Sequence, residues 1–321
     1  MRTYLVTGAA GFIGSHLCEK LVADGNKVFG IDNFDEFYSK KIKLKNLEKL
    51  LPSDLFNLLE CDIRDLDSLE HFLTNISPDV YIHLAAKAGV LPSIRTPYEY
   101  IKTNIDGTYN LLEIIRRKSN GKKLIFASSS SIYGNNKKTP FVETDPVEDP
   151  ISPYAFTKKS CELLNHTYHH LYGIDIINLR LFTVYGPRQR PDLAIHKFVD
   201  MILKNEPVTM YGDGNTSRDY TFVNDTISGF LGAIDYIVKN ENVFETVNLG
   251  NHNPVKLSEL IQTIYSLLGR KPDIKELHQQ SGDVEITYAD ISKAVKLFNY
   301  HPKTTLHEGI SAFIKWHNQN L

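Results

Sequence analysis

The sequence feature that most constrains the fold is a glycine-rich turn near the amino terminus. A short apolar run at residues 4–6 leads into Gly8, Gly11 and Gly14, and residues at helical spacing follow. Glycine permits a tight strand-to-helix turn, and it lets backbone N–H groups at the start of the helix approach a negatively charged group. The segment therefore predicts a strand–turn–helix unit that binds a diphosphate.

The next predicted strand ends at Asp32, near the interval at which an acidic residue follows such a glycine turn. A carboxylate at this place accepts hydrogen bonds from the ribose hydroxyls of a dinucleotide and repels a 2′-phosphate. We therefore expect NAD rather than NADP as cofactor. Asp62 and Ile63, after a third strand, are expected at the adenine, and residues 84–86 are expected under the dinucleotide.

Strand-like runs alternate with amphipathic segments through the first half of the chain. This alternation predicts an α/β fold with a doubly wound parallel sheet. The expected strands are residues 4–6, 27–31, 56–60, 80–83, 123–127 and 174–180. We predict an NAD-binding Rossmann domain over residues 1–185, with 225–250 returning to it. Residues 186–321, rich in Pro, Gly and Asn turns, are expected to form mainly a smaller substrate-binding domain.

Composition excludes several classes of protein. The chain has 36 Lys and Arg against 38 Asp and Glu, whereas a nucleic-acid binder normally carries a basic surplus. The lysine-rich residues 40–49 are interpreted as a solvated helix face. Three isolated cysteines offer no disulfide framework and no zinc ligands, so we expect no metal and a reducing, cytoplasmic location. No run is apolar enough for a membrane span.

A second motif predicts proton transfer. Ser152 and Pro153 mark a helix start, which places Tyr154 and Lys158 on one helix face. A nearby ammonium and a helix amino terminus favour the phenolate of Tyr154, which would make it a base. The run of serines at 128–131 ends another strand, and among them Ser129 is our choice for a hydroxyl that assists the phenol.

Together these residues resemble the extended short-chain dehydrogenase/reductase family along nearly the whole chain. Within that family the chain is most similar to nucleotide-sugar 4-epimerases acting on UDP-glucuronate, and residues 181–192 carry most of that similarity. The resemblance implies a UDP-sugar substrate, tightly held NAD, a redox-neutral C4 epimerisation through a 4-keto sugar, and a homodimer formed through helices at residues 98–117 and 153–172.

The resemblance also implies roles for individual residues. Tyr154, Lys158 and Ser129 are expected to be catalytic. The residues expected to bind NAD are Gly8, Gly11, Phe12, Ile13, Gly14, Asp32, Asn33, Asp62, Ile63, Leu84, Ala85, Ala86, Lys87, Thr103, Tyr154, Lys158 and Phe182. The residues expected to bind substrate are Ser128, Ser129, Ser130, Tyr154, Thr183, Arg190, Arg218 and Asp283. Thr183 and Arg190 would face the sugar carboxylate, and Arg218 and Asp283 the diphosphate and uridine.

Other activities start from the same oxidation. UDP-glucose or UDP-N-acetylglucosamine epimerisation is the main alternative, although Thr183 and Gln280 replace the Asn and Arg frequent in UDP-hexose epimerases. Similar 4,6-dehydratases carry an Asp-Glu pair where this chain has Ser130 and Ser131, and similar decarboxylases carry Glu at the second position. A non-catalytic NAD-binding regulator would usually lack the Tyr154 and Lys158 pair.

Overall fold

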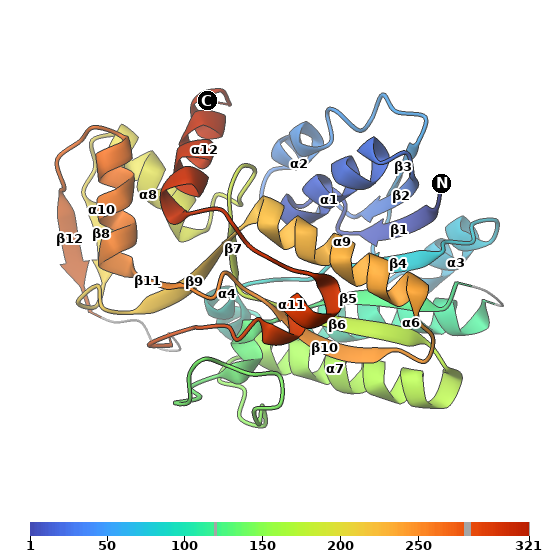
Figure 1. Cartoon of the computed structure of the whole chain (residues 1–321). Helices are drawn as coiled ribbons and strands as arrows, with labels where there is room; N and C mark the ends of the chain where they lie inside the picture. The colour runs from blue at the N-terminus through green and yellow to red at the C-terminus, as the bar shows by residue number, and fades with distance from the viewer. Residues whose placement is uncertain (119–120, 279–283, 321) are drawn as a thin grey trace.

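A parallel sheet of seven strands forms the centre of the computed structural model, which describes residues 1–118, 121–278 and 284–320 (Figure 1). Its strands are β1 (Thr3–Thr7), β2 (Lys27–Asp32), β3 (Phe56–Glu60), β4 (Val80–His83), β5 (Lys123–Ser129), β6 (Asp175–Leu181) and β10 (Phe244–Leu249). They lie in the order β10-β6-β5-β4-β1-β2-β3, and every neighbouring pair is parallel. The predicted doubly wound parallel sheet is confirmed.

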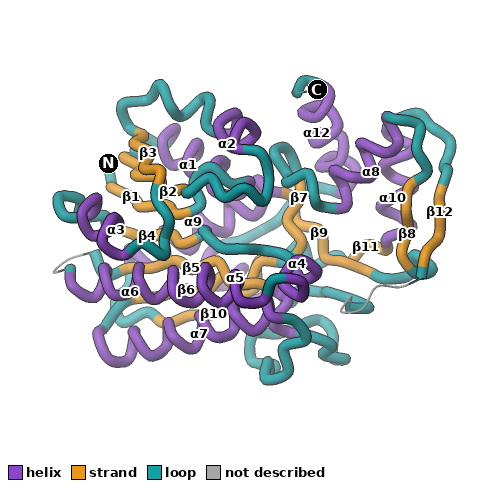
Figure 2. Tube along the Cα trace, turned by 180° about the vertical axis from the view of Figure 1, so that it is seen from behind, coloured by secondary structure: helices purple, strands orange, loops and turns teal. Residues whose placement is uncertain are grey.

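Helices cover both faces of this sheet, which is why its strands are apolar on both sides. The helices of this part are α1 (Phe12–Ala23), α2 (Lys40–Asn46), α3 (Leu66–Leu73), α4 (Val90–Arg95), α5 (Pro97–Tyr100), α6 (Gly107–Arg117), α7 (Pro153–Tyr172), α9 (Val223–Lys239) and α11 (Ser292–Phe298). In β1, Val6 packs in one core with residues of α1 and α9, whereas its neighbour Leu5 packs in a second core with residues of α3, α6 and α7. Figure 2 shows α6 and α7 side by side on one outer face.

A smaller lobe lies beside the carboxyl ends of the strands (Figure 1). It holds β7 (Thr183–Tyr185), α8 (Ala194–Leu203), β8 (Val208–Tyr211), β9 (Ser217–Phe222), β11 (Pro254–Lys256), α10 (Leu257–Leu267), β12 (Ile274–Leu277) and α12 (Leu306–Asn318). Its strands form two small sheets, β11-β9-β7 and β12-β8. The chain enters this lobe after β6 and leaves it to form α9 and β10 of the large sheet. The exact domain division at residue 185 stays a prediction.

No helix among the described residues is both long and apolar enough to cross a lipid bilayer.

Candidate functional site

A cavity of about 380 Å³ opens where the two parts of the molecule meet. Residues that follow β1, β4, β5 and β6 line it, so it lies at the carboxyl ends of the parallel strands. β1 and β4 are adjacent in the sheet although β2 and β3 separate them in sequence. Ligands of doubly wound folds bind at such a switch in strand order, because the loops diverge there.

The glycine turn forms one wall of this cavity. Gly8 has a positive φ of 71°, and a Cβ atom on Gly14 would collide with the Gly8 carbonyl oxygen, so glycine is required at both positions. Helix α1 begins at Phe12 with no side-chain cap and no acidic residue in its first turn. Its amino-terminal N–H groups and positive dipole end therefore fit a pyrophosphate.

Asp32 lies at the end of β2 and is buried beside this turn. Its carboxylate accepts hydrogen bonds from the backbone N–H groups of Ala10, at 3.0 Å, and Phe34, at 2.8 Å. Burial raises the pKa of Asp32, and the nearby Lys43 ammonium opposes that rise. Lys43 itself is buried, with its Nζ atom 3.8 Å from the Asp32 carboxylate, so the expectation of a solvated face is wrong for this lysine.

Nearly all residues expected to bind NAD line the same cavity; these are Gly8, Gly11, Phe12, Ile13, Gly14, Asp32, Asn33, Ile63, Leu84, Ala85, Ala86, Lys87, Thr103, Tyr154, Lys158 and Phe182. Asp62 is the exception. Its carboxylate accepts hydrogen bonds from Asn33 and from the Arg64 side chain. Although burial acts in the opposite direction, these bonds lower the pKa of Asp62 to about 2. Asp62 therefore positions Asn33 at the edge of the cavity.

Tyr154, Ser129 and Lys158 come together in the wall of the same cavity. The Ser152 hydroxyl caps α7 by accepting from Ala155 N, so Tyr154 lies in the first turn as expected. Burial raises the pKa of Tyr154, and the hydrogen bond with Ser129 and the charge of Arg190 oppose that rise. Lys158 donates to the Ala127 carbonyl at 2.6 Å, and burial lowers its pKa to about 8. The opposing charge at the phenol thus comes from Arg190, where the sequence pointed to Lys158.

The two serines on either side of Ser129 differ in their contacts. Ser128 donates its hydroxyl hydrogen to Glu162 at 2.6 Å, and Glu162 receives two further hydrogen bonds from Arg180. All three side chains are buried. Ser128 lines the cavity, but its hydroxyl is held in this internal network. Ser130 begins a short 3₁₀ helix (Ser130–Tyr133) and is not among the described residues that line the cavity.

Arg190 and Thr183 line the cavity on the side of the smaller lobe. The Nε and Nη2 atoms of Arg190 donate to the two carboxylate oxygens of Asp192, at 2.9 and 2.8 Å. Its guanidinium also lies over the ring of Phe37, 5.0 Å from the centroid. Asp192 therefore engages one edge of the guanidinium. On the Nη1/Nη2 edge, Nη2 donates to the Ala88 carbonyl at 3.5 Å, a long bond that a carboxylate bound at this edge can replace.

The remaining expected contacts lie elsewhere. Arg218 is on β9, where its Nη1 atom donates to the Ser217 carbonyl, and it does not line the cavity. Asp283 and Gln280 lie outside the described residues.

Several cavity residues escaped the sequence interpretation. Asp35, Phe37 and Tyr38 follow β2 and line the cavity, and Asp35 forms an ion pair with Lys87 at 3.1 Å. The aromatic and acidic residues directly after Asp32 were a usable signal. No comparable pattern marked the π-helical turn Ile101–Asp106, in which Asn104 donates to the Thr157 hydroxyl on α7.

Comparison with known proteins places this geometry among nucleotide-sugar enzymes. A family model described as GDP-mannose 4,6 dehydratase matches residues 5–313. A UDP-glucuronate 4-epimerase of Thermodesulfobacterium geofontis is 40% identical over 100% of this chain and 98% of its own length. The structure of a Bacillus cereus UDP-glucuronic acid 4-epimerase with UDP-glucuronic acid and NAD is 37% identical, with a TM-score of 0.92, and the match covers 99% of this chain and 100% of that one. A Thermotoga maritima UDP-glucose 4-epimerase with UDP-glucose is 32% identical, with a TM-score of 0.90, over 99% of both chains.

Proposed function

The chain belongs to the GDP-mannose 4,6 dehydratase family of extended short-chain dehydrogenases/reductases, and we propose that it is an NAD-dependent epimerase that interconverts UDP-glucuronate and UDP-galacturonate at C4. One observation carries this proposal: a single cavity joins a dinucleotide-binding turn, a Tyr154–Ser129 pair and the Arg190 guanidinium. The relatives that act on UDP-glucuronate match the chain over its full length.

The glycine turn, the amino terminus of α1 and Asp32 form a cradle that fits NAD. The Asp32 carboxylate keeps lone pairs for a ribose diol after accepting from Ala10 and Phe34, and its charge disfavours a 2′-phosphate. When bound, NAD supplies the acceptor and the return donor of the C4 hydride. The reaction is redox-neutral, so the protein keeps its cofactor between turnovers.

Tyr154 is the group that moves the proton. Its phenolate removes the proton of the sugar 4-hydroxyl, and the resulting phenol returns a proton to the same oxygen of the other epimer, while Ser129 donates to that oxygen. The positive charge of Arg190 and the hydrogen bond with Ser129 favour the phenolate against the effect of burial. Lys158 is fixed on the Ala127 carbonyl, so its ammonium stays at one place during turnover.

Arg190 and Thr183 select the uronate. The Nη1/Nη2 edge of Arg190 binds the C6 carboxylate, while Asp192 holds the other edge, and the Thr183 hydroxyl adds a donor. Oxidation at C4 makes a β-keto acid, which loses CO₂ when the C5–C6 bond stands perpendicular to the ketone plane. A carboxylate held by these donors is kept from that alignment. Arg218 and Asp283 are proposed to contact the UDP portion.

The matching family is called after a 4,6-dehydratase. That activity fits this cavity less well than epimerisation does. Elimination needs an acid and a base beside the sugar, and Ser130 and Ser131 stand where similar dehydratases carry an Asp-Glu pair. The carboxylates among the described lining residues are Asp32 and Asp35, which follow β2. Two strands, β1 and β4, separate β2 from β5, which carries Ser129.

We also propose that the protein is a homodimer in the cytoplasm. Its three cysteines are free and buried, as expected in a reducing compartment. Large apolar side chains are exposed along α6 and α7, among them Tyr109, Phe156, Leu163 and Leu171. Two copies that pack these helices together would bury one continuous apolar surface, as obligate interfaces do.

The decisive experiment uses purified protein without added NAD. Incubation with UDP-glucuronate should give UDP-galacturonate in NMR spectra, with little conversion of UDP-glucose or UDP-N-acetylglucosamine. The released cofactor should be NAD. Faster epimerisation of UDP-glucose would identify a neutral-hexose epimerase, and a UDP-pentose as the main product would identify a decarboxylase.

A further inference from the structure

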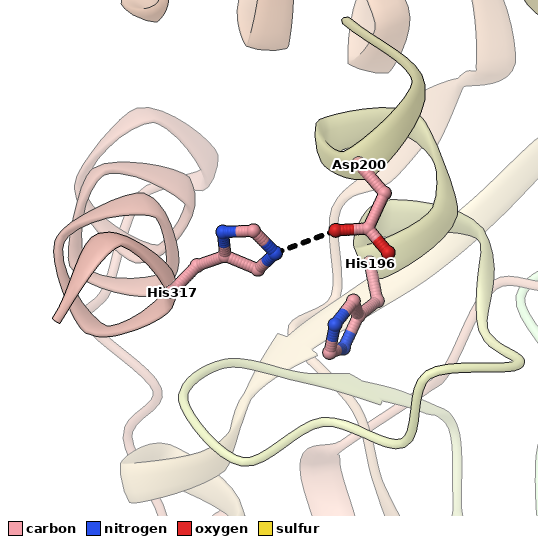
Figure 3. Close-up of side chains that lie close together, drawn as sticks. All are labelled: His196, Asp200 and His317. Carbon is pink, nitrogen blue, oxygen red and sulfur yellow. Dashed lines mark hydrogen bonds and ion pairs between the residues drawn. The ribbon is translucent and has the colours of Figure 1, made fainter. Parts of the chain in front are cut away.

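A group of metal-ligand side chains lies outside the cavity, where α8 and α12 pack together (Figure 3). His196 and Asp200 are four residues apart on α8 and share one helix face, and His317 reaches them from α12. One nitrogen or oxygen atom from each residue lies within 4.8 Å of those of the other two. We propose that these three residues bind a divalent transition-metal ion, for which Zn²⁺ is the probe.

A hydrogen bond to a backbone carbonyl orients the His196 ring. Its Nδ1 atom lies 2.9 Å from the carbonyl oxygen of Gln189, which can only accept, so Nδ1 carries the hydrogen. In the neutral ring the lone pair is then on Nε2. Metal-binding histidines characteristically donate their other ring nitrogen to a carbonyl or carboxylate in this way, because that bond fixes both tautomer and ring direction. This tautomer of His196 therefore leaves on Nε2 the lone pair that a metal ion needs.

The side chain of His317 is only 5% exposed. Its Nε2 atom is 2.6 Å from Asp200 Oδ1, and its Nδ1 atom is buried without a partner among the described residues. Metal binding at Nε2 moves the ring hydrogen to Nδ1. That move breaks no hydrogen bond at Nδ1, although the new N–H has no acceptor among the described residues. The Asp200 carboxylate then binds the metal in place of the His317 hydrogen.

Tetrahedral Zn²⁺ with nitrogen and oxygen ligands at about 2.0–2.2 Å places neighbouring ligand atoms about 3.3–3.6 Å apart. For one ion to bind all three residues, the Asp200–His317 contact must lengthen from 2.6 Å, and the separations of up to 4.8 Å within the group must shorten. Asp200 is 34% exposed and gives an ion and a water ligand access, whereas the rings of Phe313 and Trp316 pack against His196 on the other side.

A metal at this place would couple two distant segments. Gln189, which His196 holds through its carbonyl, directly precedes Arg190 in the cavity wall. An ion bound by His196, Asp200 and His317 would tie the carboxyl-terminal helix to the segment that positions Arg190.

The test uses untagged full-length protein, freed of metal with a chelator. Calorimetric titration should give about one Zn²⁺ per chain, and Co²⁺ should give the intense visible absorption of a tetrahedral ion. The variants Asp200→Asn and His317→Gln should bind Zn²⁺ more than about tenfold more weakly. His307→Gln, which removes an exposed histidine from the same helix, is the matched control and should bind like the wild type.

Hydrogen exchange of the wild type locates the site independently of any variant, because Zn²⁺ should slow exchange specifically in α8 and α12. The proposal is overturned if the wild type binds no stoichiometric Zn²⁺. It is also overturned if Co²⁺ gives the weak spectrum of a six-coordinate ion, if α8 and α12 show no protection, or if folded His317→Gln binds as well as the wild type.

Discussion

Adjacent residues of one strand have different tasks in this protein. Ser128 and Ser129 end β5, and because side chains of a strand alternate between its faces, their hydroxyls point to different surroundings. Ser128 meets Glu162, and Ser129 meets Tyr154. The sequence could predict that the serine run lies at the site. It could not predict that Ser128 and Ser129 have different partners, because Glu162 lies on a helix 34 residues further along the chain.

Tyr154→Phe should abolish turnover while the fold and the NAD content stay largely intact. The substitution removes the ionisable oxygen, and α7 keeps its cap and packing. We expect kcat to fall at least about 10²-fold, the usual scale for general acid–base catalysis.

Tyr100→Phe is the neighbouring control for this experiment. Its ring packs edge-on against Tyr154, but its hydroxyl donates to the Ala88 carbonyl. Near-normal turnover is expected for this variant. If Tyr154→Phe also turned over normally, the proton-transfer role of the phenol would have to be abandoned.

Arg190→Ala and Thr183→Ala should weaken UDP-glucuronate use far more than any residual UDP-glucose use. Both variants remove donors proposed to hold the C6 carboxylate, and a less restrained keto acid should release some UDP-pentose. Asp192→Asn should have a smaller effect in the same direction, because it loosens Arg190 without removing it. NMR product analysis with both sugars is the measurement, and equal losses on the two sugars would contradict uronate selection by these residues.

Lys158 should make the free energy of unfolding depend on pH. Burial lowers its pKa to about 8 in the folded protein, against an ordinary value of 10.5 in the unfolded chain. Between these values the unfolded chain holds one more proton, so the free energy of unfolding should rise with pH by about 1.4 kcal/mol per unit. Comparison of the wild type with Lys158→Met in urea at pH 7.5 to 10.5 isolates this contribution. An equal pH dependence in the two proteins would exclude the depressed pKa.

At the scale of elements, the sequence predicted the large sheet better than the smaller lobe. The runs at 56–60 and 80–83 match β3 and β4 residue for residue. β4 is buried throughout, as parallel strands covered on both faces are, whereas β3 lies at the sheet edge and only Phe56 of it is fully buried. No such signal identified β12, whose four residues are all exposed and which pairs with the distant β8. Its place depends on tertiary contacts that local pattern does not encode.

The ion pair of Arg180 on β6 with Glu162 on α7 is the sharpest element-scale test. Both side chains are almost fully buried, and Arg180 also donates to the Tyr133 hydroxyl. Arg180→Met leaves the Glu162 carboxylate buried without its cation, so we expect a loss of about 3–5 kcal/mol in urea denaturation. Lys239→Ala, which breaks an exposed ion pair with Asp235, should cost less than about 0.5 kcal/mol. Similar small losses for both would show that the buried pair is dispensable.

At the scale of the whole molecule, α6 and α7 present the surface proposed for dimerisation. Leu163→Glu places a charge at the centre of this face, where Leu163 is 58% exposed, and should convert a dimer to a monomer in light scattering. Leu277→Glu, at an exposed leucine on β12, is the matched control and should leave the mass unchanged. A wild type that is already monomeric, or a Leu163→Glu dimer, would rule out this interface.

β10 is translated long after β6, the strand with which it pairs, and this delay has a consequence for synthesis on the ribosome. The edge of β6 pairs with β10, which is translated only after β7, α8, β8, β9 and α9. Until residue 249 has left the exit tunnel, the nascent chain therefore carries an open apolar strand edge, of the kind that invites wrong pairing between neighbouring polysomal chains. A ribosome that pauses before residue 249 has left the tunnel would prolong that exposure, and one that pauses after that point would not.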